Sequence, residues 1–186
     1  TEDLDEVTLA VVGPQTGDNA EFGKSMKTAA QIAVDEWNEK GGVLGKKIKL
    51  VDYDDANSSE QAASIAEKIV GDETISAVLG HFSSGVAMTA AEVYQEAGIA
   101  LVNGSAAHMD YAKIGDCIFR NNAIYTTDAN TMLQIMEYLG VKKFGILNPN
   151  NDAGISVTQA VEEMMERYGE GYPIELVEPQ LYEDGT

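Results

Sequence analysis

The sequence of 186 residues contains a single cysteine, Cys117, and no long apolar stretch. One cysteine excludes an internal disulfide framework and a zinc cluster built on cysteine. Because a membrane-spanning helix needs about 20 consecutive apolar residues, we expect no transmembrane segment. Apart from Arg120, no cation lies near Cys117 in the sequence, and we interpret this cysteine as a buried, small apolar residue.

Basic residues are also scarce, since 12 Lys and Arg face 31 Asp and Glu, for a formal net charge of −19. Such a surface repels phosphate groups, so we expect neither nucleic acid nor an anionic membrane surface as a partner. The first six residues, TEDLDE, have neither the basic nor the apolar part of an export signal. Either the protein is cytoplasmic or a targeting segment has been removed.

Catalytic motifs are missing as well. The glycines of residues 13–23 fit neither the dinucleotide-binding pattern nor a phosphate-binding loop with its lysine, and no Gly-x-Ser-x-Gly elbow occurs. His81 follows a glycine at a predicted strand end, and we interpret it as a hydrogen-bonded structural residue rather than a base. The aspartates of residues 52–55 lack an octahedral ligand set and indicate a turn or a solvated face. We therefore expect no catalytic residue, no metal and no cofactor.

Short apolar runs alternate with longer helical patterns along the chain. Strands are predicted at 7–12, 48–53, 75–79, 99–102, 117–120, 144–147 and 174–179, and helices at 20–39, 58–70, 85–97, 126–139 and 155–168, with a short helical turn at 109–114. This alternation predicts an α/β fold with a doubly wound parallel sheet. We expect a first lobe at 1–120 and part of a second α/β lobe at 121–186. Because the second lobe has few elements, we expect the chain to be a fragment of a longer protein.

Three loops leave the carboxyl ends of predicted strands, where open α/β sheets bind ligands: residues 13–22, the serine loop (80–85) and the small-residue loop (103–108). In the serine loop, Ser83, Ser84 and Gly85 begin a helix and predict a site for an anion such as a carboxylate. The alternative is that Ser83 or Ser84 only caps the helix.

The other two loops leave similar alternatives open. The backbone N–H and C=O groups of residues 104–107 are available to a ligand, unless these residues form a plain strand-to-helix turn. Phe22 is either an apolar wall at the mouth of the same crevice or the first core residue of its helix.

A resemblance to a known family rests on specific runs of residues. The sequence GGVLGKKIKL (41–50), followed by two aspartates (54–55) and by GHFSSG (80–85), resembles the periplasmic leucine/isoleucine/valine-binding proteins, the type I solute-binding proteins of ABC importers. The resemblance covers nearly the whole chain and is strongest at residues 7–122. It implies two doubly wound lobes, joined by three crossovers, with ligand in the cleft. Only the first crossover, near 119–122, is present, and family members are nearly twice as long, which again implies an N-terminal fragment.

The resemblance also implies ligand contacts. The serine loop and the small-residue loop would hold the carboxylate and the ammonium of an amino acid, and an aromatic of the first loop falls on Phe22. A second-lobe tyrosine of the family falls on Ala153, while Asn122 and Tyr125, with Asn121, are added by their position after the crossover. The candidate ligand-binding residues are Phe22, Ser83, Ser84, Gly85, Ser105, Ala106, Ala107, Asn122, Tyr125 and Ala153.

Two departures from the family pattern concern the ligand. Ala107 stands where threonine is common, and Ala153 stands where the family has tyrosine. The loss of one hydroxyl and one aromatic wall leaves room for a larger or less polar ligand than a branched-chain amino acid. An aromatic acid or another carboxylate would fit this description.

The function implied by the resemblance is binding without catalysis. The protein would be exported, to the periplasm or as a lipoprotein at the cell surface. It would pass a small-molecule ligand, an amino acid or another carboxylate, to the membrane permease of an ABC transporter. A sensor domain of the same fold, serving signalling rather than transport, is the alternative. The ligand's identity and the oligomeric state stay open.

Overall fold

A computed structural model describes residues 6–183. The chain divides into two compact units, each with its own hydrophobic core. The first unit runs through Ala106 and includes Asp110–Asn122, whereas the second comprises Ala107–Met109 and the residues from Ala123 onward. No helix among the described residues is both long enough and apolar enough to cross a membrane.

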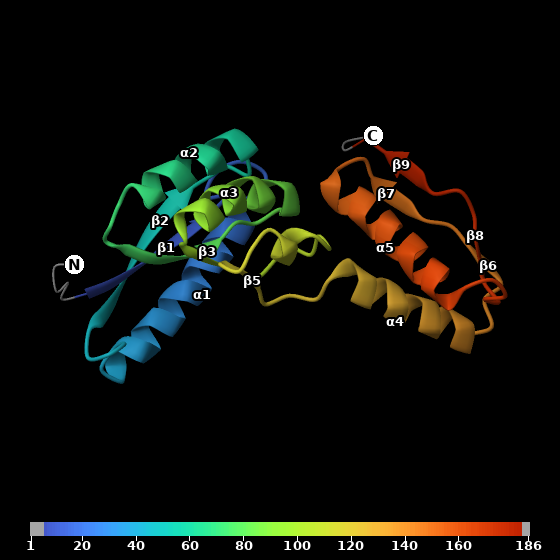
Figure 1. The fold of residues 1–186 in the computed structure, drawn as a ribbon, viewed down its shortest axis with the longest axis horizontal. Helices are drawn as coiled ribbons and strands as arrows, with labels where there is room; N and C mark the ends of the chain where they lie inside the picture. The colour runs from blue at the N-terminus through green and yellow to red at the C-terminus, as the bar shows by residue number, and fades with distance from the viewer. Residues whose placement is uncertain (1–5, 184–186) are drawn as a thin grey trace. The chain divides into compact units, whose positions relative to one another are not determined.

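The first unit is a five-stranded parallel sheet with helices on both faces, which confirms the predicted α/β class. The strand order is β2-β1-β3-β4-β5, and Figure 1 shows α1 on one face of the sheet and α2 and α3 on the other. Its elements are β1 (Glu6–Gly13), α1 (Ala20–Glu39), β2 (Lys47–Asp54), α2 (Ser59–Val70), β3 (Ile75–Gly80), α3 (Ser84–Ala97), β4 (Ala100–Asn103), the 3-10 helix η1 (Tyr111–Lys113) and β5 (Ile118–Arg120).

Local sequence signals explain where these helices begin and end. The side chain of Ser58 accepts a hydrogen bond from the Gln61 N–H and caps α2. After α1, Gly41 adopts a φ of 102°, and the next residue, Gly42, donates to the carbonyl of Trp37. Glycine suits this left-handed position because it has no Cβ.

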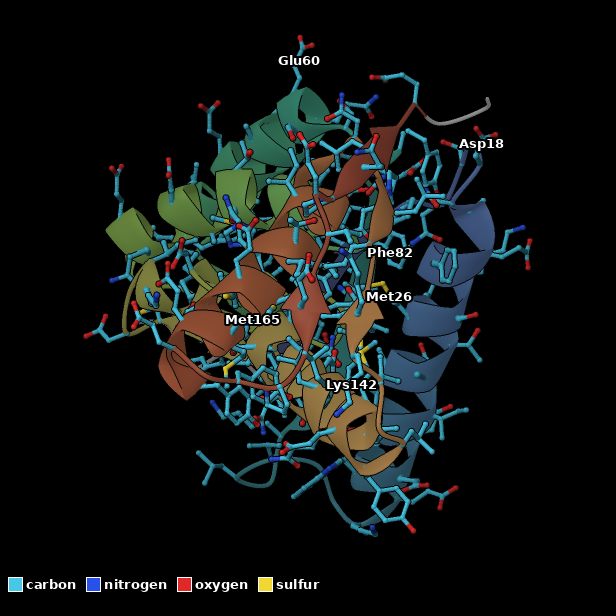
Figure 2. The ribbon with its side chains drawn as sticks, turned by 90° about the vertical axis from the view of Figure 1, so that its right-hand side faces the viewer. Asp18, Met26, Glu60, Phe82, Lys142 and Met165 are labelled. Carbon is cyan, nitrogen blue, oxygen red and sulfur yellow. The ribbon has the colours of Figure 1, made fainter. Side chains whose placement is uncertain are left out.

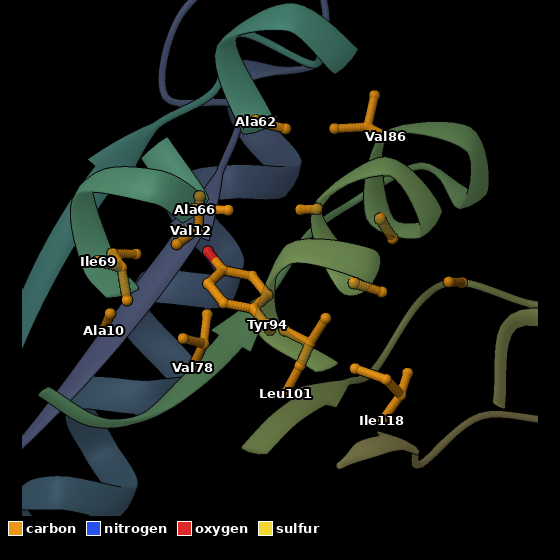
Figure 3. Packing of buried hydrophobic residues seen from close by; sticks show 14 of the residues in the cluster. Ala10, Val12, Ala62, Ala66, Ile69, Val78, Val86, Tyr94, Leu101 and Ile118 are labelled. Carbon is orange, nitrogen blue, oxygen red and sulfur yellow. The ribbon is translucent and has the colours of Figure 1, made fainter. Parts of the chain in front are cut away.

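The main core of the first unit lies between the sheet and the helices α2 and α3 (Figure 3). Alternate strand residues face it, among them Val12, Val78 and Leu101, all fully buried. Tyr94 of α3 is also fully buried, and burial, with a smaller contribution from the nearby Asp55 carboxylate, raises the pKa of its hydroxyl. The intervening strand residues face the side of the sheet that carries α1.

The second unit consists of two helices and two short parallel strand pairs, β6-β8 and β7-β9. Its elements are α4 (Tyr125–Tyr138), β6 (Lys143–Phe144), β7 (Leu147–Pro149), α5 (Asp152–Tyr168), β8 (Glu175–Leu176) and β9 (Gln180–Tyr182). The predictions of one strand at 144–147 and one at 174–179 are therefore wrong in extent. The ladder is interrupted where Pro179 has no N–H to donate, and it resumes when Gln180 donates to the carbonyl of Ile146.

The border between the units differs slightly from the predicted lobes. The chain passes into the second unit after Asn122, and the earlier residues 107–109, which the prediction placed in the first lobe, also belong to it. Two contacts explain this assignment. The carbonyl of Ala107 accepts a hydrogen bond from the Tyr125 N–H, and Met109 packs against the core of the second unit.

Candidate functional site

Strands β1, β3 and β4 of the first unit are parallel, so the loops that follow them leave the same edge of the sheet. A cavity of about 380 Å³ lies beside this edge, between the sheet and α1. Its lining is mainly apolar and includes Val11, Leu79 and Val102 from the strands. Met26 of α1 and Phe82 of the serine loop, both labelled in Figure 2, also line it.

Two aromatic rings form one wall of the cavity. The rings of Phe22 and Phe82 are stacked, with centroids 4.4 Å apart and an interplanar angle of 17°. Phe22 remains 53% exposed, so the interpretation of this residue as a core residue of α1 is wrong. Instead, it is one of the residues that line the cavity.

The serine loop leaves the first N–H groups of α3 without a hydrogen-bond acceptor from the described residues. Ser83 stands at the N-cap, yet its side chain makes no capping hydrogen bond and instead donates to the Asn57 Oδ1 at 2.7 Å. The first helical bond runs from the Ala87 N–H to the Ser83 carbonyl. Residues 84–86 therefore present N–H groups without an intrahelical acceptor. The capping interpretation of this loop is wrong.

Ser84 adds a hydroxyl at the same place. Ser84 is 5% exposed, and its hydroxyl has no hydrogen-bond partner among the described residues. Free N–H groups, the positive end of the helix dipole and a hydroxyl donor together favour an anion. The chemistry available at the start of α3 is thus the binding of a carboxylate or a similar group.

The small-residue loop is held by the side chain of Asn103, the last residue of β4. The Oδ1 of Asn103 accepts hydrogen bonds from the N–H groups of Ser105 at 2.7 Å and Ala106 at 2.6 Å. The expectation that this loop offers those N–H groups to a ligand is therefore wrong. The Ser105 hydroxyl donates to the carbonyl of Phe82 at 2.6 Å, so its remaining capacity is that of an acceptor.

His81 and Asp55 form a buried hydrogen-bonded pair next to these loops. The Nδ1 of His81 lies 2.7 Å from the Oδ2 of Asp55, and both residues are fully buried. The interpretation of His81 as a hydrogen-bonded structural residue is confirmed. In residues 6–183, no three His, Cys, Asp or Glu side chains gather where they could hold a metal ion.

Asp54 fixes the first loop. Its carboxylate accepts hydrogen bonds from the Gln15 N–H at 2.7 Å, from the Thr16 hydroxyl at 2.7 Å and from the Ala56 N–H at 2.9 Å. Burial by itself raises the pKa of Asp54, but the hydrogen bonds together outweigh it, so the pKa lies below the ordinary value. Asp52 forms an ion pair with Lys27. Asp54 thus builds a turn, as the sequence indicated, whereas Asp55 is fully buried and also bonds to His81.

The remaining candidate residues are divided between the two units. Asn122 is exposed in the first unit and donates through Nδ2 to the Ser105 carbonyl at 2.9 Å. In the second unit, Ala107 is buried, Tyr125 packs partly buried against the core, and Ala153 is half-buried in α5. Burial raises the pKa of Tyr125. The first unit alone therefore gathers Phe22, Ser83, Ser84, Gly85, Ser105 and Ala106 around its strand ends.

Three residues differ from the predictions or lie outside them. Cys117 is half-buried rather than buried, at the position just before β5. Phe82 lies inside the GHFSSG run but is not among the predicted site residues. Asn103 was placed just beyond its strand; an asparagine before Gly-Ser at a strand end is the available signal, because its short side chain bonds to nearby backbone groups.

Comparisons with known proteins give a consistent result. The sequence model of a family described as periplasmic binding protein matches residues 6–184. An amino acid binding protein of Pseudomonas aeruginosa is 44% identical over 106 residues, which are 56% of this chain and 28% of that protein. The Leu/Ile/Val-binding protein of Escherichia coli K12 is 29% identical over 165 residues, which are 88% of this chain and 45% of that protein.

The solved structures agree with the sequence relatives. A branched-chain amino acid transporter substrate binding protein of Streptococcus pneumoniae, in complex with isoleucine, superposes with a TM-score of 0.82 at 26% identity. The match covers 97% of this chain and 51% of that one. The chain thus spans about half the length of this solved structure and less than half of the two curated relatives.

Proposed function

Because the chain belongs to the periplasmic binding protein family, we propose that the whole protein is the solute-binding protein of an ABC importer. It binds an amino acid or a related small carboxylate in the cleft between two lobes, without chemical turnover. It works outside the cytoplasm, either in the periplasm or at the cell surface on a lipid anchor. Its second partner is the membrane permease that accepts the ligand.

The observation that carries this proposal is the open start of α3. The Ser84 hydroxyl and the N–H groups of residues 84–86 have no partner within the described residues. They follow Phe82, which lines the apolar cavity, although residues 83–86 are not among its lining. The N–H donors of a helix start that lacks a side-chain cap are left to water or to a ligand. A carboxylate bound there would accept from these donors and interact favourably with the helix dipole.

The rest of an amino acid has matching groups nearby. The Ser105 hydroxyl donates its hydrogen bond to the Phe82 carbonyl, so its free lone pairs can accept a hydrogen bond from an α-ammonium group. The stacked rings of Phe22 and Phe82 and the apolar lining behind them suit an uncharged side chain. Relatives named for binding leucine, isoleucine and valine support the same class of ligand.

The second lobe would complete the site when the two lobes close by a hinge motion, which buries the ligand. We propose that Tyr125 and Ala153 contribute from that side. Ala107 and Ala153 are smaller than the residues usual in the family, so ligands with larger side chains, including aromatic acids, belong in any test.

The direct test is a thermal-shift screen of the whole protein with leucine, isoleucine, valine, aromatic amino acids and small carboxylates. A ligand at 100 times its Kd stabilises the folded state by about 2.7 kcal/mol, which is readily measured. A shift with any of these ligands supports the proposal. No change in melting temperature with any member of the panel refutes the ligand class. Uptake of the ligand by vesicles that carry the permease is a separate experiment, which distinguishes transport from sensing.

Replacement of Ser84 by alanine tests the site itself. The loss of the hydroxyl leaves the carboxylate short of one donor, and we expect ligand binding to weaken by about 1–3 kcal/mol. Ser59→Ala is the matched control, because Ser59 is the first residue of α2 just as Ser84 is the first residue of α3. Calorimetric titration of both variants is the measurement. Equal affinity in the two variants would remove Ser84 from the site.

A further inference from the structure

We infer that Asn103 is a positioning residue, whose side chain fixes the serine loop against the small-residue loop so that the groups on both are presented to the ligand at a constant separation. The inference rests on the proposed function for its ligand, but the hydrogen bonds that support it all lie within the protein and do not depend on the ligand. Asn103 is fully buried and is not itself among the residues that line the cavity.

The side chain of Asn103 uses its whole hydrogen-bonding capacity between the two loops. Its Nδ2 donates to the carbonyls of Gly80 and His81, each at 2.8 Å, at the start of the serine loop. Its Oδ1 accepts from the N–H groups of Ser105 and Ala106 in the small-residue loop. An amide has two donors and two acceptor sites, and all four are engaged.

The orientation of this amide is fixed by its surroundings. Two carbonyl oxygens face one end and two N–H groups face the other, so exchange of the nitrogen and the oxygen would place like groups against each other. Only a side chain with a donor at one end and an acceptor at the other fits. Aspartate has the same shape but lacks the donor, which makes it the sharpest probe.

Further bonds extend from this point to the neighbouring segments. The main-chain carbonyl of Asn103 accepts from the Asn121 N–H at 2.8 Å, where the chain leaves β5. The Ser105 hydroxyl adds a second link to the Phe82 carbonyl. Asn103 thus lies at the centre of a buried network that joins the loops after β3, β4 and β5, and such networks hold a single arrangement when every member is satisfied.

This arrangement has a consequence for affinity. If binding requires both loops in their observed positions, the apparent Kd rises in inverse proportion to the fraction of molecules that keep them there. Asn103→Asp retains the acceptor for Ser105 and Ala106 but turns a carboxylate oxygen towards the carbonyls of Gly80 and His81. We expect the Kd for the probe to rise at least about tenfold, which corresponds to a competent fraction of about one tenth.

Asn38→Asp is the matched control. The Asn38 side chain donates to the carbonyl of Ile48 at 2.8 Å and accepts from the Ile48 N–H at 2.7 Å, so it makes the same kinds of bond between α1 and β2. It lies outside the candidate site. Both variants should unfold at lower temperature than the parent protein, but only the Asn103 variant should lose affinity.

The experiment measures the Kd of L-leucine and of L-phenylalanine for the whole protein and both variants, with circular dichroism to show that each is folded. A tenfold loss confined to the Asn103 variant supports the inference, and unchanged affinity in a folded Asn103→Asp protein overturns it. If that variant does not fold, the uncharged Asn103→Ser replaces it with the same criteria.

A second readout separates this inference from the proposed function. Hydrogen exchange at the Ser105 and Ala106 amides, measured without ligand, should accelerate at least about tenfold in Asn103→Ser and stay unchanged in Asn38→Asp, because the serine is too short to reach both N–H groups. If the parent protein binds neither probe, the proposed ligand class fails while faster exchange still sustains the positioning of the loop. Equal exchange in both variants overturns that positioning.

Discussion

Alanine at position 23 should push the start of α1 away from the first loop. Gly23 is buried, and a Cβ built on it would lie 1.8 Å from the carbonyl oxygen of Pro14 and 2.4 Å from its carbonyl carbon. Real Cβ atoms essentially never approach other atoms within 3.0 Å, so the contact must lengthen by about 1 Å. Both atoms belong to the backbone and cannot turn aside, which means that the helix or the loop has to move.

The cost follows from the rigidity of both partners. Overpacking of a buried site typically costs about 1–3 kcal/mol, and a clash with backbone belongs at the upper end of this range. The displacement also reaches the ligand site, because the preceding residue, Phe22, stacks on Phe82. We therefore expect Gly23→Ala to lower both the free energy of unfolding and the affinity for ligand.

Gly13→Ala supplies the control. A Cβ on Gly13 would meet the Sδ of Met26 at 3.4 Å, and Met26 is a flexible side chain that can adjust. Removal of a glycine also reduces the freedom of the unfolded chain, so we expect a change within about 1 kcal/mol of the parent protein. Urea unfolding of the two variants is the assay. Equal midpoints for Gly23→Ala and Gly13→Ala would refute the clash.

Two further predictions concern other parts of the chain. Gly154→Ala should destabilise the second unit by a similar amount, because its Cβ would lie 2.0 Å from the Pro149 carbonyl oxygen, and hydrogen exchange along α5 would report it. Asp54→Asn should lower stability at pH 7. The pKa of Asp54 is lowered in the folded protein, so its charged form stabilises the fold above the ordinary carboxyl pKa of about 4, and this stability is lost as the pH falls through the folded-state pKa. In the variant, the free energy of unfolding should therefore depend less on pH below about 4. Urea titrations at several pH values check this, and an unchanged slope in the variant would contradict it.

The architecture of the first unit could be predicted because it follows from local patterns. The helical spacing of apolar residues in α1 and the apolar run of β1 specify their elements without help from distant residues. The divided strands of the second unit could not be predicted in the same way. Their ends depend on how the strands pair in space, with the Val177 N–H bonded to Phe144 and the Gln180 N–H to Ile146, and a single sequence does not contain that register.

The three loops at the strand ends could be located from the sequence, but the hydrogen bonds within them could not. The loops were found because strand ends in parallel sheets lie at one edge. The partners of their polar groups come from elsewhere in the chain: Ser83 bonds to Asn57 instead of capping its own helix, and Asn103 bonds to Gly80. A serine at a helix start predicts a cap on local grounds, and only the folded chain shows that another acceptor lies closer in space.

Helices α1 and α5 share two features at their starts, although the sequence shows no repeat and only Asn151 of α5 accepts a capping hydrogen bond. In each, an asparagine stands at the N-cap, Asn19 or Asn151, and a glycine early in the helix lies against the carbonyl of a proline at the end of the preceding strand or just beyond it. The residue before that glycine is Phe22 in the first unit and Ala153 in the second. The glycine, not its neighbour, makes the tight backbone contact, so the size of residue 153 is free of that packing constraint. Under the proposed function, we predict that the alanine there shapes the ligand wall.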